Sequence, residues 1–241
     1  MKEAMYRIVQ ISDTHISKYG HFLEERFDEA ARTISKLDPP PNIVVHTGDL
    51  TDNGVLADYE YALEKLKAIT CKTIIAAGNH DERNFGQSLF REMISPLEYE
   101  FDDGKCKFFI MNSPEPDRDE GRLGRRRQTY LEESLQALQE DAIRVIVFHH
   151  HLVPVPHSGR EMNVLEDAGD ILDLILRHKV NLVLMGHRHV RRVLRINDTV
   201  LVNAGTTSSM RTRGRFGHTL NVIDIDHQGR AEVAELRLGE I

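Results

Sequence analysis

Polar and apolar positions in roughly the first 190 residues alternate between two kinds of segment. Short runs rich in β-branched residues predict buried strands, at Tyr6 to Ser12, Asn42 to His46, Lys72 to Ala76, Phe108 to Met111, Arg144 to Phe148 and Asn181 to Met185. Amphipathic stretches predict helices, at Leu23 to Leu37, Ala57 to Ile69, Leu131 to Gln139 and Ala168 to Leu176. This alternation is typical of βαβ units, so we expect a largely parallel sheet covered by helices.

The pattern changes after about Val190. The later apolar segments are strand-like with no helix between them, at Arg192 to Ile196, Val200 to Asn203, His218 to Ile225 and Ala231 to Leu236. We therefore expect the chain to finish in antiparallel hairpins. Because no linker and no internal repeat divides the 241 residues, they predict a single domain, 1–241, an α/β sandwich with strands from both halves.

Two long segments predict surface loops, at residues 112–128 and 151–167. Loops of this length inside a compact domain are often functional. We expect both loops to influence which substrate the protein accepts.

Charge and composition exclude several classes of function. With 31 Lys and Arg against 38 Asp and Glu, the net charge is -7, which disfavours nucleic acid and anionic membranes as main partners. The chain has no apolar run of membrane-spanning length and does not start like a signal peptide, so we expect a cytoplasmic protein. The sequence leaves open whether the protein forms a homo-oligomer. The two cysteines fit a reducing cell interior. The number of histidines, 13, is the unusual feature of the composition.

Five polar clusters directly follow predicted strands. They are Asp13-Thr14-His15, Gly48-Asp49-Leu50-Thr51-Asp52, Gly78-Asn79-His80-Asp81, His149-His150-His151 and Gly186-His187-Arg188-His189. Any one of them alone could be a helix cap or a polar turn. Because open α/β sheets bind ligands beyond the carboxyl ends of their strands, we expect all five to converge on one crevice.

The side chains in these clusters are typical metal ligands. Carboxylate and imidazole groups without thiolates suit Mn, Fe, Zn or Co and disfavour a structural zinc. The seven candidate ligands are Asp13, His15, Asp49, Asn79, His149, His187 and His189. Seven are too many for one tetrahedral ion but suit two ions that share a carboxylate, an arrangement used to hydrolyse phosphate esters. We therefore expect two divalent or mixed-valence metal ions and a small phosphate-ester substrate.

The ordered motifs D-x-H, GD-x-x-D, GNH-D, the histidine tract and GH-x-H resemble the calcineurin-like metallophosphoesterase superfamily, from about Ile8 to about Ile225. The segment Val202 to Ser209 is similar to bacterial class III cyclic-nucleotide phosphodiesterases. The expected fold is a four-layer α/β/β/α sandwich of mixed sheets with the metal site at the strand C-terminal ends. The expected activity is hydrolysis of small phosphodiesters, 3',5'-cyclic nucleotides foremost, by a metal-bridging hydroxide.

The resemblance also implies roles for individual residues. His80 would be the general acid or would stabilise the transition state, and Asp52 would orient His80. The metal ligands would divide into two sets and a bridge: Asp13, His15 and His189 for one ion; Asn79, His149 and His187 for the other; Asp49 between them.

Three further residues are candidates to contact substrate. Where many relatives have two histidines and then prolines, this chain has His149-His150-His151-Leu152. We expect His149 to be the ligand because it stands at the strand end, while His150 supports the ligands or faces substrate. Arg211 and Arg213 follow a strand end near GH-x-H, and arginine suits bidentate phosphate recognition.

Other functions within the superfamily compete with this one. A phosphomonoesterase and a glycerophosphodiesterase remain open. A lipid-precursor pyrophosphatase is disfavoured because such relatives typically have arginine where this chain has His80. A DNA nuclease is disfavoured by chain length and charge, and a non-catalytic scaffold by the presence of all seven ligands.

Overall fold

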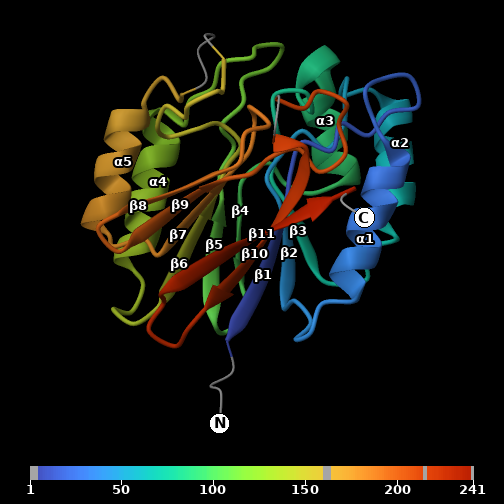
Figure 1. The fold of residues 1–241 in the computed structure, drawn as a ribbon. Coiled ribbons are helices and arrows are strands. Elements are labelled where there is room, and N and C mark those ends of the chain that lie inside the picture. Colours follow the sequence, from blue (N-terminus) through green and yellow to red (C-terminus); the bar gives the residue numbers. More distant parts are fainter. Residues whose placement is uncertain (1–4, 160–163, 214–215, 240–241) are drawn as a thin grey trace.

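Two mixed β-sheets pack face to face in the computed structural model, which describes residues 5–159, 164–213 and 216–239 (Figure 1). The first sheet has strand order β11-β10-β1-β2-β3 and the second β4-β5-β6-β7-β9-β8. The strands are β1 (Tyr6–Ile11), β2 (Ile43–His46), β3 (Thr73–Ile75), β4 (Tyr99–Asp102), β5 (Cys106–Ile110), β6 (Ile143–Val147), β7 (Leu182–Met185), β8 (Arg192–Ile196), β9 (Thr199–Asn203), β10 (His218–Ile225) and β11 (Ala231–Leu238).

Parallel strands make up one side of the first sheet and the middle of the second. Strands β1, β2 and β3 pair in parallel, as do β5, β6, β7 and β9. The expected hairpins at the end of the chain are confirmed, since β8 pairs antiparallel with β9 and β10 with β11. Strand β10 also pairs antiparallel with β1, so the last hairpin completes the sheet that the first strands begin.

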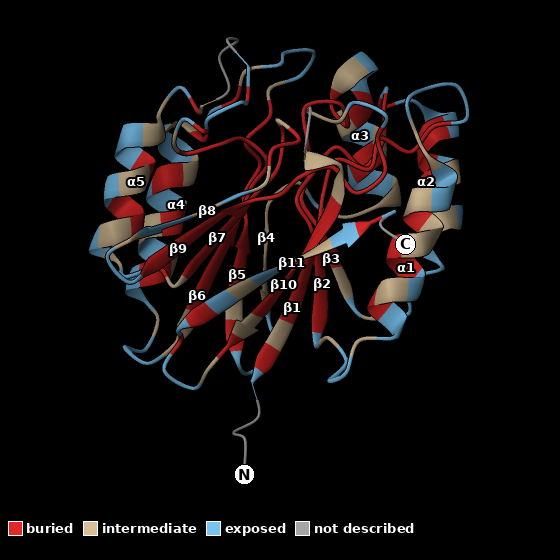
Figure 2. Ribbon diagram, viewed as in Figure 1, coloured by how far each residue is buried: buried red, intermediate tan, exposed pale blue. Residues whose placement is uncertain are grey.

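Helices cover the outer face of each sheet, which confirms the α/β/β/α sandwich. Helices α1 (Glu24–Ser35), α2 (Leu56–Leu66) and α3 (Gly86–Met93), with the 3₁₀ turn η1 (Arg83–Phe85), lie on the side of the first sheet; α4 (Gly124–Gln136) and α5 (Ala168–Arg177) lie on the second. Successive strand residues point to opposite faces. Ile8 thus packs between the sheets while Val9 packs under the helices. Burial on both faces explains the continuous apolar runs, and the strands are mostly red in Figure 2.

Some elements differ from the sequence expectations. The expected loop at 112–128 is too long, because α4 begins at Gly124. Its first amides are capped from elsewhere in the chain: the Asp167 carboxylate accepts the N–H groups of Leu123 and Gly124 at 3.1 and 2.7 Å. Helix α3 and edge strand β4 were not expected. In the described part of the chain no helix has the length and apolar character needed to cross a membrane.

Candidate active site

The five clusters meet at the carboxyl ends of the parallel strands, at the upper edge of both sheets in Figure 1. Asp13, Asp49 and Asn79 follow β1, β2 and β3, while His149 and His187 follow β6 and β7. All seven expected ligands are buried: Asp13, His15, Asp49, Asn79, His149, His187 and His189. Five of them, His15, Asp49, Asn79, His187 and His189, line a crevice of about 1060 Å³, and Asp13 and His149 contact these five.

The backbone is strained at most of these positions. Asp13, His15, Asp49, His187 and His189 all have positive φ, between 49° and 80°, a region that residues other than glycine rarely adopt. Neighbouring loops hold them there, because the amide of Asp13 donates to Gly48 O and that of His15 to Asp49 O, each at 3.0 Å. Strain of this kind persists where function requires a particular side-chain direction.

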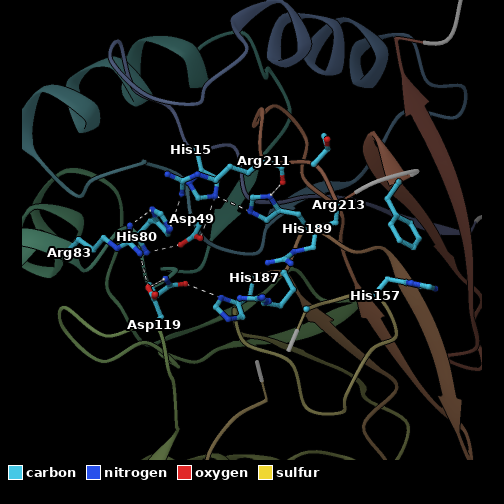
Figure 3. A pocket seen from close by; sticks show the side chains of 15 residues that line it. His15, Asp49, His80, Arg83, Asp119, His157, His187, His189, Arg211 and Arg213 are labelled. Atoms are coloured by element: carbon cyan, nitrogen blue, oxygen red, sulfur yellow. Dashed lines mark hydrogen bonds and ion pairs between the residues drawn. The ribbon is translucent and has the colours of Figure 1, made fainter. Parts of the chain in front are cut away.

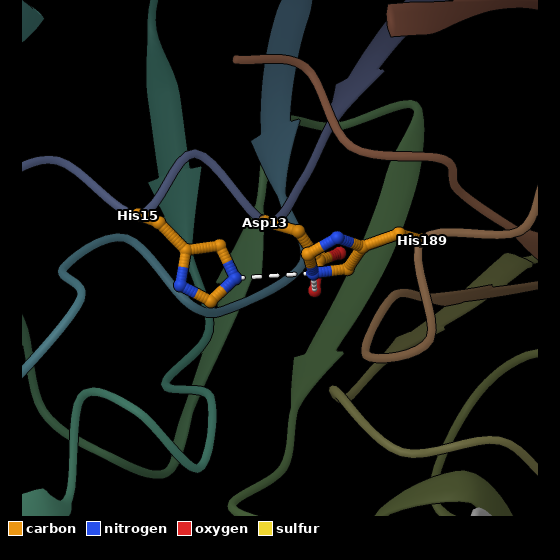
Figure 4. Close-up of side chains that lie close together, drawn as sticks. All are labelled: Asp13, His15 and His189. Carbon is orange, nitrogen blue, oxygen red and sulfur yellow. Dashed lines mark hydrogen bonds and ion pairs between the residues drawn. The ribbon is translucent and has the colours of Figure 1, made fainter. Parts of the chain in front are cut away.

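Asp13, His15 and His189 form one group of converging ligand atoms (Figure 4). The Nε2 atoms of His15 and His189 are 3.1 Å apart, and His189 Nε2 is 3.3 Å from Asp13 Oδ1. His15 Nδ1 donates to the Asp52 carboxylate at 3.0 Å and His189 Nδ1 to Arg211 O at 2.5 Å. In the neutral rings, both Nε2 atoms therefore carry lone pairs. Lone pairs that face each other and a carboxylate fit a shared cation.

A second group contains Asn79, His149 and His187. Asn79 Oδ1 is 3.1 Å from His149 Nε2 and 3.0 Å from His187 Nδ1. His149 Nδ1 donates to Thr47 O at 2.8 Å, so in the neutral ring the lone pair is on Nε2. The amide nitrogen of Asn79 donates to Asp119 Oδ1 at 3.1 Å, so its oxygen faces the histidines. The Asn79 oxygen and these two histidine nitrogens also fit a cation, which would replace the second proton of His149.

Asp49 stands between the two groups. Its Oδ2 is 3.6 Å from His15 Nε2 and 3.4 Å from His149 Nε2. Burial alone would raise the pKa of Asp49, but the neighbouring histidines His149 and His80 hold it well below its usual value. Burial likewise opposes a charge on His149, yet Asp49 and Asp13 raise its pKa to about 9. The carboxylates thus favour positive charge at the floor of the crevice.

His80 lies beside Asp49, whose Oδ1 accepts its amide N–H at 2.8 Å. Its Nδ1 donates to the backbone carbonyl of Asp52 at 2.6 Å. The Asp52 carboxylate is 3.5 Å from His80 Nδ1 but only 3.0 Å from His15 Nδ1. Burial lowers the pKa of His80, but Asp49 and Asp52 outweigh it and raise the value overall. Asp52 therefore contacts both histidines, and its carboxylate mainly fixes the ring of His15, as carboxylates often do for metal-binding histidines.

Two guanidinium groups flank His80 (Figure 3). Arg211 Nη1 is 3.3 Å from His80 Nε2 and 3.4 Å from Asp52 Oδ1. Arg83 Nη1 is 3.0 Å from His80 Nδ1, and its Nη2 donates to Asp119 at 2.7 Å. Arg213 also lines the crevice.

His150 is buried behind the ligands. Its Nδ1 is 2.9 Å from Ser113 Oγ and its Nε2 is 3.1 Å from the carbonyl of Asp119. Burial lowers the pKa of His150 to about 3. Since both ring nitrogens face protein groups, this geometry agrees with support of the ligands rather than with contact to substrate.

Sequence reasoning gave no role to Asp81, Arg83 or Asp119. Asp81 ties two ligand loops together, because its carboxylate accepts the amides of Leu50, Thr51 and Gly78 at 3.1, 2.8 and 2.9 Å. Burial raises the pKa of Asp81 to about 6. The sequence did carry a signal for Asp81, because it is the last residue of the GNH-D motif. No local signal marks Asp119, which reaches the site from a long loop.

Paired mixed sheets with buried aspartate, asparagine and histidine side chains at the strand ends are the arrangement expected of a metal-dependent phosphoester hydrolase. Residues 6–191 match the family model of calcineurin-like phosphoesterases, and the chain belongs to this family. The resemblance noted in the sequence is thereby confirmed.

Curated relatives from bacteria cover most of the chain. It is 27% identical over 196 residues to the 3',5'-cyclic adenosine monophosphate phosphodiesterase of Escherichia coli, covering 78% of this chain and 70% of that one. It is 28% identical over 216 residues to a "probable glycerophosphodiester phosphodiesterase" of Arcobacter nitrofigilis, covering 83% and 78%.

Solved structures share the fold at low sequence identity. A purple acid phosphatase from yellow lupin has a TM-score of 0.74 and 17% identity, and the match covers 93% of this chain but half of the lupin chain. A dimetal phosphatase from Danio rerio has a TM-score of 0.69 and 13% identity, covering 96% and 98%. Both likenesses confirm the fold class.

Proposed function

We propose that this protein is a binuclear metal-dependent phosphodiesterase of small substrates, with 3',5'-cyclic nucleotides the leading class. The observation that carries the proposal is the pair of ligand groups that share Asp49 on the floor of one crevice, beside His80. The relatives named as cyclic-nucleotide phosphodiesterases support the substrate class. We also propose one domain over residues 1–241, supported by the last hairpin pairing with β1.

The ligand groups suit two ions, with Mn, Fe, Zn or Co as candidates. When bound, the ions would offset the charge of phosphate oxygens and lower the pKa of coordinated water. About four positive charges at this point would let a chain of net charge -7 bind an anion. The residues that would hold them are Asp13, His15 and His189 on one side, Asn79, His149 and His187 on the other, and Asp49 as the bridge.

The other polar side chains act on the substrate and on the ligands. The carbonyl of Asp52 holds His80 Nδ1, so Nε2 is the atom that would give a proton to the departing alkoxide. Arg211 would donate to phosphate oxygens next to His80, and Arg213 would extend this contact along the wall. Asp119 keeps the oxygen of Asn79 turned toward the histidines.

Hydrolysis of glycerophosphodiesters is the second candidate. The Arcobacter relative, whose name describes this activity, favours it. Both candidates use the same ligands and the same acid, so the difference lies in the walls of the crevice.

Chelated enzyme assayed with bis(p-nitrophenyl) phosphate tests the first part of the proposal. Added Mn²⁺ should restore turnover, and the absence of turnover with several divalent ions would contradict the proposal. A panel of cyclic nucleotides, glycerophosphodiesters and monoesters, ranked by kcat/KM, then separates the candidates. Cyclic nucleotides should rank first, and a glycerophosphodiester in that place would favour the second candidate.

A further inference from the structure

The crevice extends well beyond the ligand groups on one side. His157, Arg188, Arg213 and Phe216 line that part. In Figure 3, His187 and His189 lie in the middle, with His80 and Arg83 on one side of them and His157 on the other. A volume of about 1060 Å³ is comparable to a pocket for a drug-sized ligand and far exceeds the needs of one phosphate group. The extra space is large enough for the remainder of a phosphodiester substrate.

Two aromatic rings form a wall of this extension. The ring centroids of His157 and Phe216 are 6.1 Å apart and the rings are tilted by 50°. The two residues come from separate loops, one after β6 and one after β9. Both rings are accessible, His157 being exposed and Phe216 partly exposed. A flat ligand placed against this wall would remove apolar surface from water.

The backbone holds His157 in an uncommon conformation. Its φ is +69°, and residues other than glycine pay for that conformation in free energy. The turn is closed by neighbouring contacts, since Ser158 donates to Val155 O from its hydroxyl at 2.6 Å and from its amide at 3.3 Å. The turn directs this imidazole to the crevice wall, where it meets Phe216.

The charges around the pair discriminate between possible ligand groups. Arg188 Nε donates to Ser158 O at 2.8 Å, which places a guanidinium next to His157, and Arg213 lines the same part of the crevice. Aromatic rings alone would also attract a choline headgroup, but such a headgroup has no acceptor for the N–H groups of the neighbouring guanidinium groups. A ring that carries nitrogen and oxygen acceptors suits both the aromatic wall and the guanidinium donors.

We propose that His157 and Phe216 form the surface on which the nucleobase of the substrate stacks. This proposal rests on the proposed function, because it assumes that the phosphate lies over the ligand groups. It deepens that function, since it makes the base a source of specificity and orients the substrate with its base away from Arg83.

Two substrates that differ only in the base test the proposal: 3',5'-cyclic AMP, and the methyl riboside 3',5'-cyclic phosphate that lacks a base. For the wild-type enzyme loaded with Mn²⁺, kcat/KM should favour cyclic AMP by about five- to a hundredfold, the range expected for stacking of one base. Phe216→Ala and His157→Ala should remove most of this preference through a higher KM. Both variants should leave the analogue without a base unaffected, and Phe216→Tyr should keep the preference.

Tyr130→Ala is the matched control, because Tyr130 is an exposed aromatic residue on α4 and should not change the preference. Equal kcat/KM for the two substrates in the wild type would overturn the proposal. So would equal losses for both substrates in Phe216→Ala, which would indicate a structural role. If neither substrate is hydrolysed, the proposed activity on cyclic nucleotides is wrong. Calorimetric binding of the same two compounds then tests whether the base stacks on His157 and Phe216. Tighter binding of cyclic AMP supports stacking, and equal binding refutes it.

Discussion

At the scale of single residues, Asp49 has the most demanding position in the crevice. One carboxylate oxygen faces a histidine of each ligand group, and the other holds the amide of His80. Replacing it with alanine should remove both ions and lower kcat/KM by at least about a hundredfold, because both groups lose a shared charge. Elemental analysis after gel filtration measures the metal content. Asp226→Asn is the control, because Asp226 lies in the turn between β10 and β11. If Asp49→Ala retained two ions, Asp49 would not be the bridging ligand.

His80 should behave differently from a ligand. His80→Ala should keep both ions, because the proposed ligands stay in place, and should lower kcat by about 10² to 10⁴ for poor leaving groups. The loss should be smaller for p-nitrophenolate, which leaves without a proton. A series of aryl and alkyl esters measures this dependence. Equal losses across the series would argue against a general acid, and His227→Ala provides a control with an exposed histidine.

At the scale of elements, features that depend on local sequence could be predicted, whereas features that depend on contacts between distant segments could not. The strands and their polar ends could be predicted because a buried strand followed directly by aspartate, asparagine or histidine, after a glycine at three of the five ends, is a local signal. The start of α4 could not, because its cap is Asp167 from a distant loop. Asp119 and the pairing of His157 with Phe216 were missed for the same reason, since both depend on how long loops return to the crevice.

The turns at the strand ends are as important as the ligands that they carry. A Cβ atom on Gly78 would lie 2.1 Å from the amide nitrogen of Asp49 and 2.2 Å from its Oδ1. Gly78→Ala should therefore displace Asp49, reduce the metal content and lower kcat/KM by at least about tenfold, although no ligand is changed. Metal analysis and turnover of bis(p-nitrophenyl) phosphate measure both effects.

Gly169 offers the matched glycine control. It lies in α5, where an added Cβ would meet nothing within 4 Å. Gly169→Ala should keep full activity and gain up to about 1 kcal/mol of stability from helix propensity. If the two variants bound metal equally well, close approach at Gly78 would not be what positions Asp49.

At the scale of the whole molecule, the ligand set joins the two sheets. Asp13, Asp49 and Asn79 follow strands of the first sheet, whereas His149 and His187 follow strands of the second. Each proposed ion would take ligands from both sheets. Such an ion acts as a cross-link at the open edge of the sandwich, where the core between the sheets gives way to polar loops.

Removal of metal should therefore lower the stability of the entire fold. Each ion present at about a hundred times its Kd stabilises a folded protein by about 2.7 kcal/mol, which corresponds to roughly 5 to 10 °C in Tm for each ion in a chain of this size. Thermal unfolding of chelated protein, before and after addition of Mn²⁺, measures the shift. Asp49→Ala should show no response to Mn²⁺ because it lacks the shared ligand. If wild-type protein with its ions demonstrably removed kept the same Tm, the site would not join the sheets energetically, and its strained turns would have to be held by the protein alone.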